Sequence, residues 1–484
     1  MADTTTDETA VVPGESKLRH QERSLFIVLS MKGTSMRMHS RLFMLFLSVI
    51  ILIAAGATPS LAGGTTSRVS VSTDEVQGND GSLGPAISGN GRFVAFTSVA
   101  TNLVRDDTNG LNDTFVRDRQ RGTTTRVSVG QHGEQQDGPS FGHAIARSGR
   151  LVAFVSLATN LIPGDTNAKS DVFVRDLGAG TTRRVSLGAG GLQSNGDSGF
   201  PAVSADGRFI AFASSASNLV PDDTNGVDDV FVRDRRTRIT ARVSVGPDGV
   251  QGNGASPAPP PPASFPAISA DGRFVAFVSL ASNLVGGDTN GVADVFVRDR
   301  QQGTTRRVSV ATDGAQANGA SFIPSISDTG RSVAFTSSAT NLIASDTNGA
   351  DDVFVHDLTT GQTRRVSIGP SGRQANGSSV SGVGAVSATG RFVTFTSLAN
   401  NLVPEDTNGA TDVFVRDLRL GWTSRVSVRT NGAQASGPSG GPFNAISASG
   451  RHIAFISFAS DLVPRDTNDA VDVFVRDMGR RGHR

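Results

Sequence analysis

The most regular polar signal in the chain is the pattern Asp-Thr-Asn-x-x-x-Asp, which recurs seven times with identical spacing. Closely spaced carboxylate and amide oxygens are the ligands that a hard cation such as calcium requires. A calcium loop of the Asp-x-(Asp/Asn)-x-(Asp/Asn)-Gly type has a third ligand at its fifth position, and these segments have none. The spacing therefore favours a structural role, in which the side chains bond their own turn and the start of a strand. Calcium is the one cofactor left open, with the candidate ligands Asp107/Asn109/Asp113, Asp165/Asn167/Asp171, Asp223/Asn225/Asp229, Asp288/Asn290/Asp294, Asp346/Asn348/Asp352, Asp406/Asn408/Asp412 and Asp466/Asn468/Asp472.

Two serines stand in segments that resemble nucleophile motifs, Gly196-Asp197-Ser198-Gly199 and Gly437-Pro438-Ser439-Gly440-Gly441. A nucleophilic serine needs a histidine base and an orienting acid within reach. Both serines lie in copies of a loop that recurs along the chain without such partners. No catalytic residue is assigned from the sequence.

Four histidines fall at inequivalent positions, His132, His143, His356 and His452, and a fifth, His483, lies in the tail. None of them makes a metal-ligand spacing. Only His143 suggests the kind of asymmetric polar cluster that a catalytic site would require. The Arg-Asp pair of Arg233-Asp234 recurs in six copies and is interpreted as an ion pair and turn.

These residues are carried by an internal repeat, which decides the fold. Three motif types each occur seven times: GRFVAF, DVFVRD and RVSV. The Gly-Arg motifs begin 58, 58, 65, 58, 60 and 60 residues apart, and the longest interval contains the proline run Pro257–Pro262. The GRFVAF copies start at Gly91, Gly149, Gly207, Gly272, Gly330, Gly390 and Gly450, and the RVSV copies at Arg68, Arg126, Arg184, Arg242, Arg307, Arg365 and Arg425.

Each motif is short, rich in Val, Phe, Ile and Thr, and bounded by turn residues, which is typical of a β-strand. A weaker fourth strand precedes each Gly-Arg turn, as at 201–204. We call the four strands A (PAVS), B (RFIAF), C (DVFVRD) and D (TRVSV). Four antiparallel strands repeated seven times predict an all-β, seven-bladed β-propeller. An RVSV copy at Arg68 precedes the first blade, so it is expected to supply strand D to the last blade and close the ring.

Alternating strand direction places the D–A and B–C loops on one face. These loops are long and polar, and loops held by a rigid scaffold commonly bind ligands. This loop-rich face is the predicted binding face, with the candidates Gln193, Asn195, Gln316, Asn318, Gln374 and Asn376.

A leader precedes the repeats. The apolar run 42–57 follows Lys32, Arg37 and Arg41 and ends in a small-residue segment, which predicts a signal peptide cleaved after Ala62. A retained anchor is the alternative, although the run is shorter than the roughly 20 residues of a span. We expect a leader over 1–62, a propeller over 63–484, and export to the periplasm or the medium.

Charge and cysteine content narrow the classes of function. The chain has 45 Lys and Arg against 44 Asp and Glu, and no Cys. A thiolate metal site, a disulfide scaffold and a Cys nucleophile are excluded. The basic footprint of a nucleic-acid binder is absent.

The segment Ala205-Asp206-Gly207-Arg208-Phe209-Ile210-Ala211-Phe212, followed by 229–234, resembles the blade repeat of TolB-like (WD40-like) β-propellers. The resemblance covers about residues 66–478 and implies the propeller fold. The chain has Ala or Gly where that family usually has the turn proline. The resemblance implies no particular function.

Because the blades account for the whole chain after the leader, the leading hypothesis is an exported, monomeric, non-catalytic scaffold. It would bind a protein or another envelope or extracellular ligand through its loop-rich face. One alternative is a calcium-stabilised ligand- or carbohydrate-binding module. Another is a propeller hydrolase with its site at the central channel.

Overall fold

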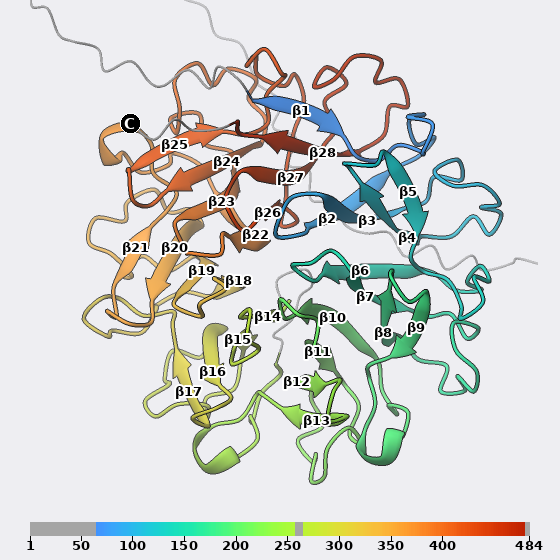
Figure 1. Ribbon diagram of the computed structural model, residues 1–484. Helices are drawn as coiled ribbons and strands as arrows, with labels where there is room; N and C mark the ends of the chain where they lie inside the picture. Colours follow the sequence, from blue (N-terminus) through green and yellow to red (C-terminus); the bar gives the residue numbers. More distant parts are fainter. Residues whose placement is uncertain (1–63, 257–264, 480–484) are drawn as a thin grey trace, which may run out of the picture. The chain divides into compact units, whose positions relative to one another are not determined.

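The computed structural model describes residues 64–256 and 265–479, which fold into seven four-stranded antiparallel sheets. The expected leader, the proline run at 257–262 and His483 lie outside the described residues. The sheets are arranged as the blades of a ring (Figure 1), and each sheet contacts the next through its inner strands. The predicted seven-bladed β-propeller is therefore confirmed. No helix in the described part of the chain is long and apolar enough to cross a bilayer.

Blades 1 to 6 are β2–β5, β6–β9, β10–β13, β14–β17, β18–β21 and β22–β25, and blade 7 is β26–β28 with β1. The innermost A strands are β2 (Ser82–Ile87), β6 (Ser140–Ile145), β10 (Ser198–Val203), β14 (Ala267–Ile268), β18 (Ser321–Ile326), β22 (Ser379–Val386) and β26 (Ala445–Ile446). The B strands are β3 (Phe93–Ser98), β7 (Leu151–Ser156), β11 (Phe209–Ser214), β15 (Phe274–Ser279), β19 (Ser332–Ser337), β23 (Phe392–Ser397) and β27 (His452–Ser457).

The C strands are β4 (Asp113–Asp118), β8 (Asp171–Asp176), β12 (Asp229–Asp234), β16 (Asp294–Asp299), β20 (Asp352–Asp357), β24 (Asp412–Asp417) and β28 (Asp472–Asp477). The outermost D strands are β5 (Thr123–Arg126), β9 (Thr181–Arg184), β13 (Ile239–Arg242), β17 (Thr304–Arg307), β21 (Thr363–Arg365), β25 (Trp422–Arg425) and β1 (Thr65–Arg68). Three short 3₁₀ turns are η1 (Ala189–Gly191), η2 (Pro247–Gly249) and η3 (Pro370–Gly372). The D strands end at the Arg of each RVSV motif and are shorter than the sequence predicts.

The ring closes as expected, because β1 pairs with β28 in blade 7. Thr66 Oγ1 also donates to the carbonyl of Val428 at 2.5 Å, which ties β1 to the end of blade 6. The first described strand and the last therefore share one sheet (Figure 1).

The core lies between the blades. A Phe on each B strand pairs in register with a Phe on the C strand, as Phe212 does with Phe231, and their ring centroids lie 5.9 Å apart. These rings are fully buried and pack against the apolar side chains of the preceding blade. Because each blade buries its faces on its neighbours, a single domain can grow past the size of one ordinary core.

The Arg-Asp motif that ends six of the C strands is not the ion pair that the sequence suggests. Asp234 instead pairs with Arg208 of the Gly-Arg turn, at 2.6 Å, and Arg233 donates to the carbonyl of Leu187. Adjacent residues on a strand point to opposite faces, so Arg233 and Asp234 cannot meet. The turn glycine before Arg208, Gly207, has a φ of 75°, and a Cβ there would clash with Leu151 of the neighbouring blade.

Candidate functional site

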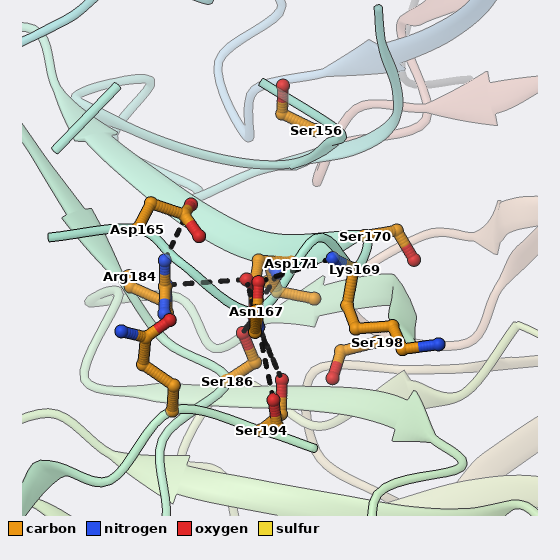
Figure 2. A network of polar contacts seen from close by, with 12 residues as sticks. Ser156, Asp165, Asn167, Lys169, Ser170, Asp171, Arg184, Ser186, Ser194 and Ser198 are labelled. Carbon is orange, nitrogen blue, oxygen red and sulfur yellow. Dashed lines mark hydrogen bonds and ion pairs between the residues drawn. The ribbon is translucent and has the colours of Figure 1, made fainter. Parts of the chain in front are cut away.

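The repeated Asp-Thr-Asn-x-x-x-Asp segments each form a closed network with an arginine of the same blade. In blade 2, Arg184 of β9 lies 2.5 Å from Asp165 and 3.4 Å from Asp171 (Figure 2). Ser186 donates to Asp171 at 2.5 Å, and Asn167 donates to it at 2.9 Å. Burial raises the pKa of Asp171, while Ser186 and Arg184 oppose this effect.

The same arrangement holds in every blade, since the Arg of each RVSV motif pairs with both carboxylates. The other six sets are Arg68 with Asp466 and Asp472, Arg126 with Asp107 and Asp113, Arg242 with Asp223 and Asp229, Arg307 with Asp288 and Asp294, Arg365 with Asp346 and Asp352, and Arg425 with Asp406 and Asp412.

The side-chain amide of the asparagine in each segment forms hydrogen bonds through both its nitrogen and its oxygen. Its Nδ2 donates to a backbone carbonyl of the following D–A loop, and its Oδ1 accepts the backbone N–H two residues further on, as Asn290 Oδ1 does from Val292 at 3.3 Å. The Nδ2 bonds run from Asn109 to Gln136, Asn167 to Ser194, Asn225 to Gly252, Asn290 to Ala317, Asn348 to Ala375, Asn408 to Ala435 and Asn468 to Gly78. The Oδ1 bonds come from Leu111, Lys169, Val227, Val292, Ala350, Ala410 and Ala470, in the same order.

Calcium ligation by these asparagines stays a prediction. The oxygen that would face a cation closes the turn of its own loop instead, which is the local bonding that Asn favours. The same Oδ1 bond forms at Asn109, Asn167, Asn225, Asn290, Asn348, Asn408 and Asn468.

The carboxylates of these clusters also fit a calcium ion poorly, because a guanidinium already lies against both of them. A second cation in the same place would be repelled by the first. Within the described residues, no three His, Asp or Glu side chains converge into a metal site. Calcium binding itself stays a prediction.

The candidate residues of the loop-rich face hold the loops together. Asn195 donates to Ser217 of the next blade at 2.9 Å. Asn318 and Asn376 make the equivalent bonds to Thr340 and Asn400. The glutamines reach back to their own blade, as Gln316 does to Thr289 and Gln374 to Asp346. Their recurrence is thus explained by bonds between loops, and their binding role stays a prediction.

His143 lies on β6, an innermost strand, but the structure does not build a hydrolase site around it. Its Nδ1 lies 3.2 Å from Thr97 Oγ1 of blade 1. Burial lowers the pKa of His143 to about 4, so the ring is neutral near pH 7. Among the described residues, no Asp or Glu forms a hydrogen bond or ion pair with it. The two serines are also engaged: Ser198 bonds Ser214, and Ser439 bonds Ser457.

A groove of about 700 Å³ is lined by residues of blades 2 and 3, among them residues of β9 and of the end of β12. Five arginines line it, and we name it the arginine groove. Gln131, Gln193 and Thr182 also line it, and no Asp or Glu is among the described residues that do. The five arginines are Arg183, Arg184, Arg233, Arg235 and Arg238.

Only Arg184 of the five has carboxylate partners within the described residues, those of its Asp cluster. Arg233 and Arg235 donate to backbone carbonyls, of Leu187 and Gly207 respectively. Arg183 and Arg238 are exposed, and their side chains make no hydrogen bond or ion pair with any described residue. Four cationic groups therefore share one groove without a paired carboxylate.

The charges of Arg183 and Arg238 each act on one of the other two groups. Burial lowers the pKa of Arg233, and the charge of Arg238 lowers it further. Burial likewise lowers the pKa of Arg235; Asp176 opposes this effect, whereas Arg183 adds to it. A bound anion stabilises neighbouring like charges, because it cancels their repulsion.

The arginine groove breaks the symmetry of the repeat. Arg233 has counterparts in most blades, whereas Arg238 stands where five other blades have Gly at the same turn, with a φ of 61°. Those glycines are Gly122, Gly180, Gly303, Gly361 and Gly421, all with positive φ.

Sequence reasoning missed this site because its two walls come from different blades. The available signal was Arg238 itself, the one departure from Gly in an otherwise regular turn. Gln193 was the single predicted binding residue that lines the groove.

No protein-family model matches the chain, and no curated protein matches it. Solved propeller structures do resemble it. An oligogalacturonate lyase in complex with manganese has 11% identity and a TM-score of 0.49, over 86% of this chain and 90% of its own. A prolyl endopeptidase has 12% identity and a TM-score of 0.48, over 79% and 46%. TolB from Acinetobacter baumannii has 14% identity and a TM-score of 0.36, over 76% of each chain. Similarities this low concern the fold alone.

These findings overturn the expectation of a non-catalytic scaffold. That hypothesis assumed that catalysis would require a separate domain in addition to the blades. Named enzymes and TolB share this architecture.

Proposed function

We propose that the protein recognises an acidic oligosaccharide, which it binds in the arginine groove between blades 2 and 3. The observation that carries the proposal is the presence of four arginines without carboxylate partners in one groove of a nearly neutral chain. Guanidinium groups bind carboxylate and sulfate groups through paired, charge-assisted hydrogen bonds.

The neutral lining residues support a sugar as the carrier of the anionic groups. Gln131 and Gln193 bring amides that can both donate to and accept from hydroxyl groups. Ile162, Pro163 and Leu187 supply apolar surface for the C–H faces of a sugar ring. Ligand pockets commonly combine such apolar walls with a few polar groups that fix orientation.

The test compares two arginines in identical local sequence. Arg183 lies in β9 and Arg306 in β17, both within the segment TTRR, and both are exposed. Arg306 is in blade 4, away from the groove. In titration calorimetry at low salt, the full chain should bind polygalacturonate and not a neutral glucan. Arg183→Ala should weaken binding about fivefold, and Arg306→Ala should leave it unchanged.

Release of reducing or unsaturated ends is measured in the same samples, so that turnover of the bound polymer is tested together with binding. Binding that increases with salt, or equal loss in both variants, would contradict the proposal. An exposed charge pair weakens as salt rises, so the expected affinity falls.

We also propose that the protein acts outside the cytoplasm, in the periplasm or the medium. The support is the basic, apolar and small-residue order of 32–62. Terminal sequencing of the protein recovered from its native host tests this. A chain that begins near Gly63 is expected, and a chain that retains the apolar run would favour an anchor.

A further inference from the structure

Asparagine followed by glycine is a reactive pair, because the glycine nitrogen can attack the side-chain carboxamide and glycine has no side chain to shield it. The fold opposes this reaction at Asn318, which precedes Gly319. Its Nδ2 donates to Thr340 Oγ1 at 2.9 Å, and its Oδ1 accepts the backbone N–H of Thr340 at 2.8 Å. A Cβ on Gly319 would lie 2.9 Å from the backbone of Ser338, so this glycine is closely packed as well.

With one exception, the other Asn-Gly pairs of the described chain are held in comparable ways. The asparagines of the Asp-Thr-Asn segments bond through both Nδ2 and Oδ1. Asn90 makes no Nδ2 bond to a described residue, but Gly91 after it is buried. Three more asparagines bond the next blade through both atoms: Asn195 to Ser217, Asn253 to Ser282 and Asn376 to Asn400.

The exception is Asn431, in the loop between blades 6 and 7. Asn431 and Gly432 are both exposed, and a Cβ on Gly432 would meet nothing within 4 Å. Oδ1 accepts the N–H of Ala433 at 3.0 Å, which holds the carboxamide near the backbone of the next two residues, whereas Nδ2 bonds no described residue. The Gly432 amide donates to the Arg429 carbonyl at 2.9 Å within this exposed turn. Exposed turns open at a low free energy, so the nitrogen is accessible.

We propose that Asn431 is a site of spontaneous deamidation, which needs water and no other reactant. The Gly432 nitrogen forms a bond to Cγ of Asn431 as the Cγ–Nδ2 bond breaks. The displaced NH₂ group takes up the proton of the Gly432 amide and leaves as ammonia. Water then opens the resulting succinimide at either carbonyl, which gives an aspartyl or an isoaspartyl residue at this position.

The aspartyl product fits the turn, because the loop between blades 4 and 5 already contains it. Asp313 stands in the segment TDGAQ, where Asn431 stands in TNGAQ. Its Oδ1 accepts the N–H of Ala315 at 3.0 Å, the counterpart of the bond from Ala433 to Asn431.

The isoaspartyl product instead adds a carbon to the backbone of a turn that two hydrogen bonds close, Gly432 to Arg429 and Arg429 to Ala433. Thr430 of this turn accepts the N–H of Thr66 in β1 at 3.1 Å. This product therefore loosens the loop from the strand that closes the ring.

The experiment follows Asn431 and Asn318 in the full chain by peptide mass spectrometry during incubation at mildly alkaline pH. Both stand in the tripeptide Asn-Gly-Ala, so their rates should be equal in urea. In the folded chain Asn431 should convert about tenfold faster, since Asn318 must first release its bonds to blade 5. Equal rates in the folded chain would overturn the proposal. A difference that persists in urea would overturn its structural cause, because the local sequence would then set the rates.

Asn431→Asp supplies the aspartyl product as a reference. Its urea midpoint should equal that of fresh wild type, whereas incubated wild type should unfold at a lower urea concentration. The same variant after incubation is the matched control and should keep more of its midpoint, since an Asp-Gly pair forms the succinimide more slowly than Asn-Gly. An unchanged midpoint in wild type that has accumulated isoaspartate would overturn the effect on the ring closure.

Discussion

Arg147 of blade 2 and Asp328 of blade 5 form an ion pair, although 181 residues separate them and their blades are not neighbours. Both residues lie in the turns between strands A and B, which meet around the axis. Backbone hydrogen bonds link these turns, as from Ala270 to Asp328 and from Asp328 to Ala388. The other five blades carry Gly or Ala at this position, namely Gly89, Ala205, Ala270, Ala388 and Ala448. The pair therefore joins opposite sides of the ring.

Arg147→Ala should lower stability, because Asp328 would lose its partner. Burial raises the pKa of this carboxyl, and Arg147 opposes that rise. Both side chains are about a quarter exposed, so the loss should be about 1 kcal/mol. Urea unfolding gives the value, and the double variant Arg147→Ala/Asp328→Ala should be less destabilised than the sum of the two single variants. Additive effects would show that the pair contributes nothing.

The number and spacing of the repeats were enough to predict the seven blades, because each blade repeats the same pattern of apolar and turn residues. They also predicted that the strand at Arg68 closes the ring in the last blade. It could not reveal the arginine groove or the axial ion pair. Arg183 and Arg238 are far apart in sequence, and only the packing of blade 2 on blade 3 brings them to one groove. The Asp clusters were found from the sequence, but their role was not. Their residue types left calcium open although their spacing favoured a structural role, and the neutralising arginine came from another motif.

The pH dependence of stability should follow the seven buried Asp residues that begin the C strands. Burial raises the pKa of Asp113 from 3.8 to about 6, with Ser128 and Arg126 opposing it. The folded state therefore binds more protons than the unfolded state between about pH 4 and 6. Stability should fall as pH rises through this window, by at most about 3 kcal/mol for this group.

Melting temperatures from pH 4.5 to 7 check this expectation. Asp113→Asn should flatten the slope, and Asp74→Asn, at an exposed loop carboxylate, should not. The carboxylates that pair with the Gly-Arg turns have lowered, not raised, pKa values. Arg208 holds the pKa of Asp234 well below its usual range, so its contribution is lost only at lower pH. A wild-type stability that rises from pH 4.5 to 7 would contradict the assignment.

Calcium should not stabilise the wild-type protein, because Arg184 and its counterparts already neutralise the Asp clusters. The melting temperature should be the same in EDTA and in millimolar calcium. Arg184→Ala should cost about 3 kcal/mol, since it leaves two buried carboxylates without their cation. A calcium-dependent rise of several degrees in the wild type would instead support the metal interpretation of these segments.

Removal of β1 should unfold the ring at its closure. Deletion through Val71 takes away the ladder between β1 and β28 and the hydrogen bond from Ser70 to Asp472. It also removes Arg68, which pairs with the buried Asp466 and Asp472. The free energy of unfolding should fall by at least about 3 kcal/mol, because these two carboxylates stay buried without a cation.

Urea midpoints of two shortened chains test the closure. Deletion through Leu61 keeps β1 and should retain the midpoint of the full chain. Deletion through Val71 should lower it or abolish the cooperative transition, since β28 becomes an unpaired edge. Arg68→Ala separates the two causes: it removes the ion pairs and keeps the strand, so its midpoint should fall between those of the two deletions. Equal midpoints in all chains would show that blade 7 does not depend on β1.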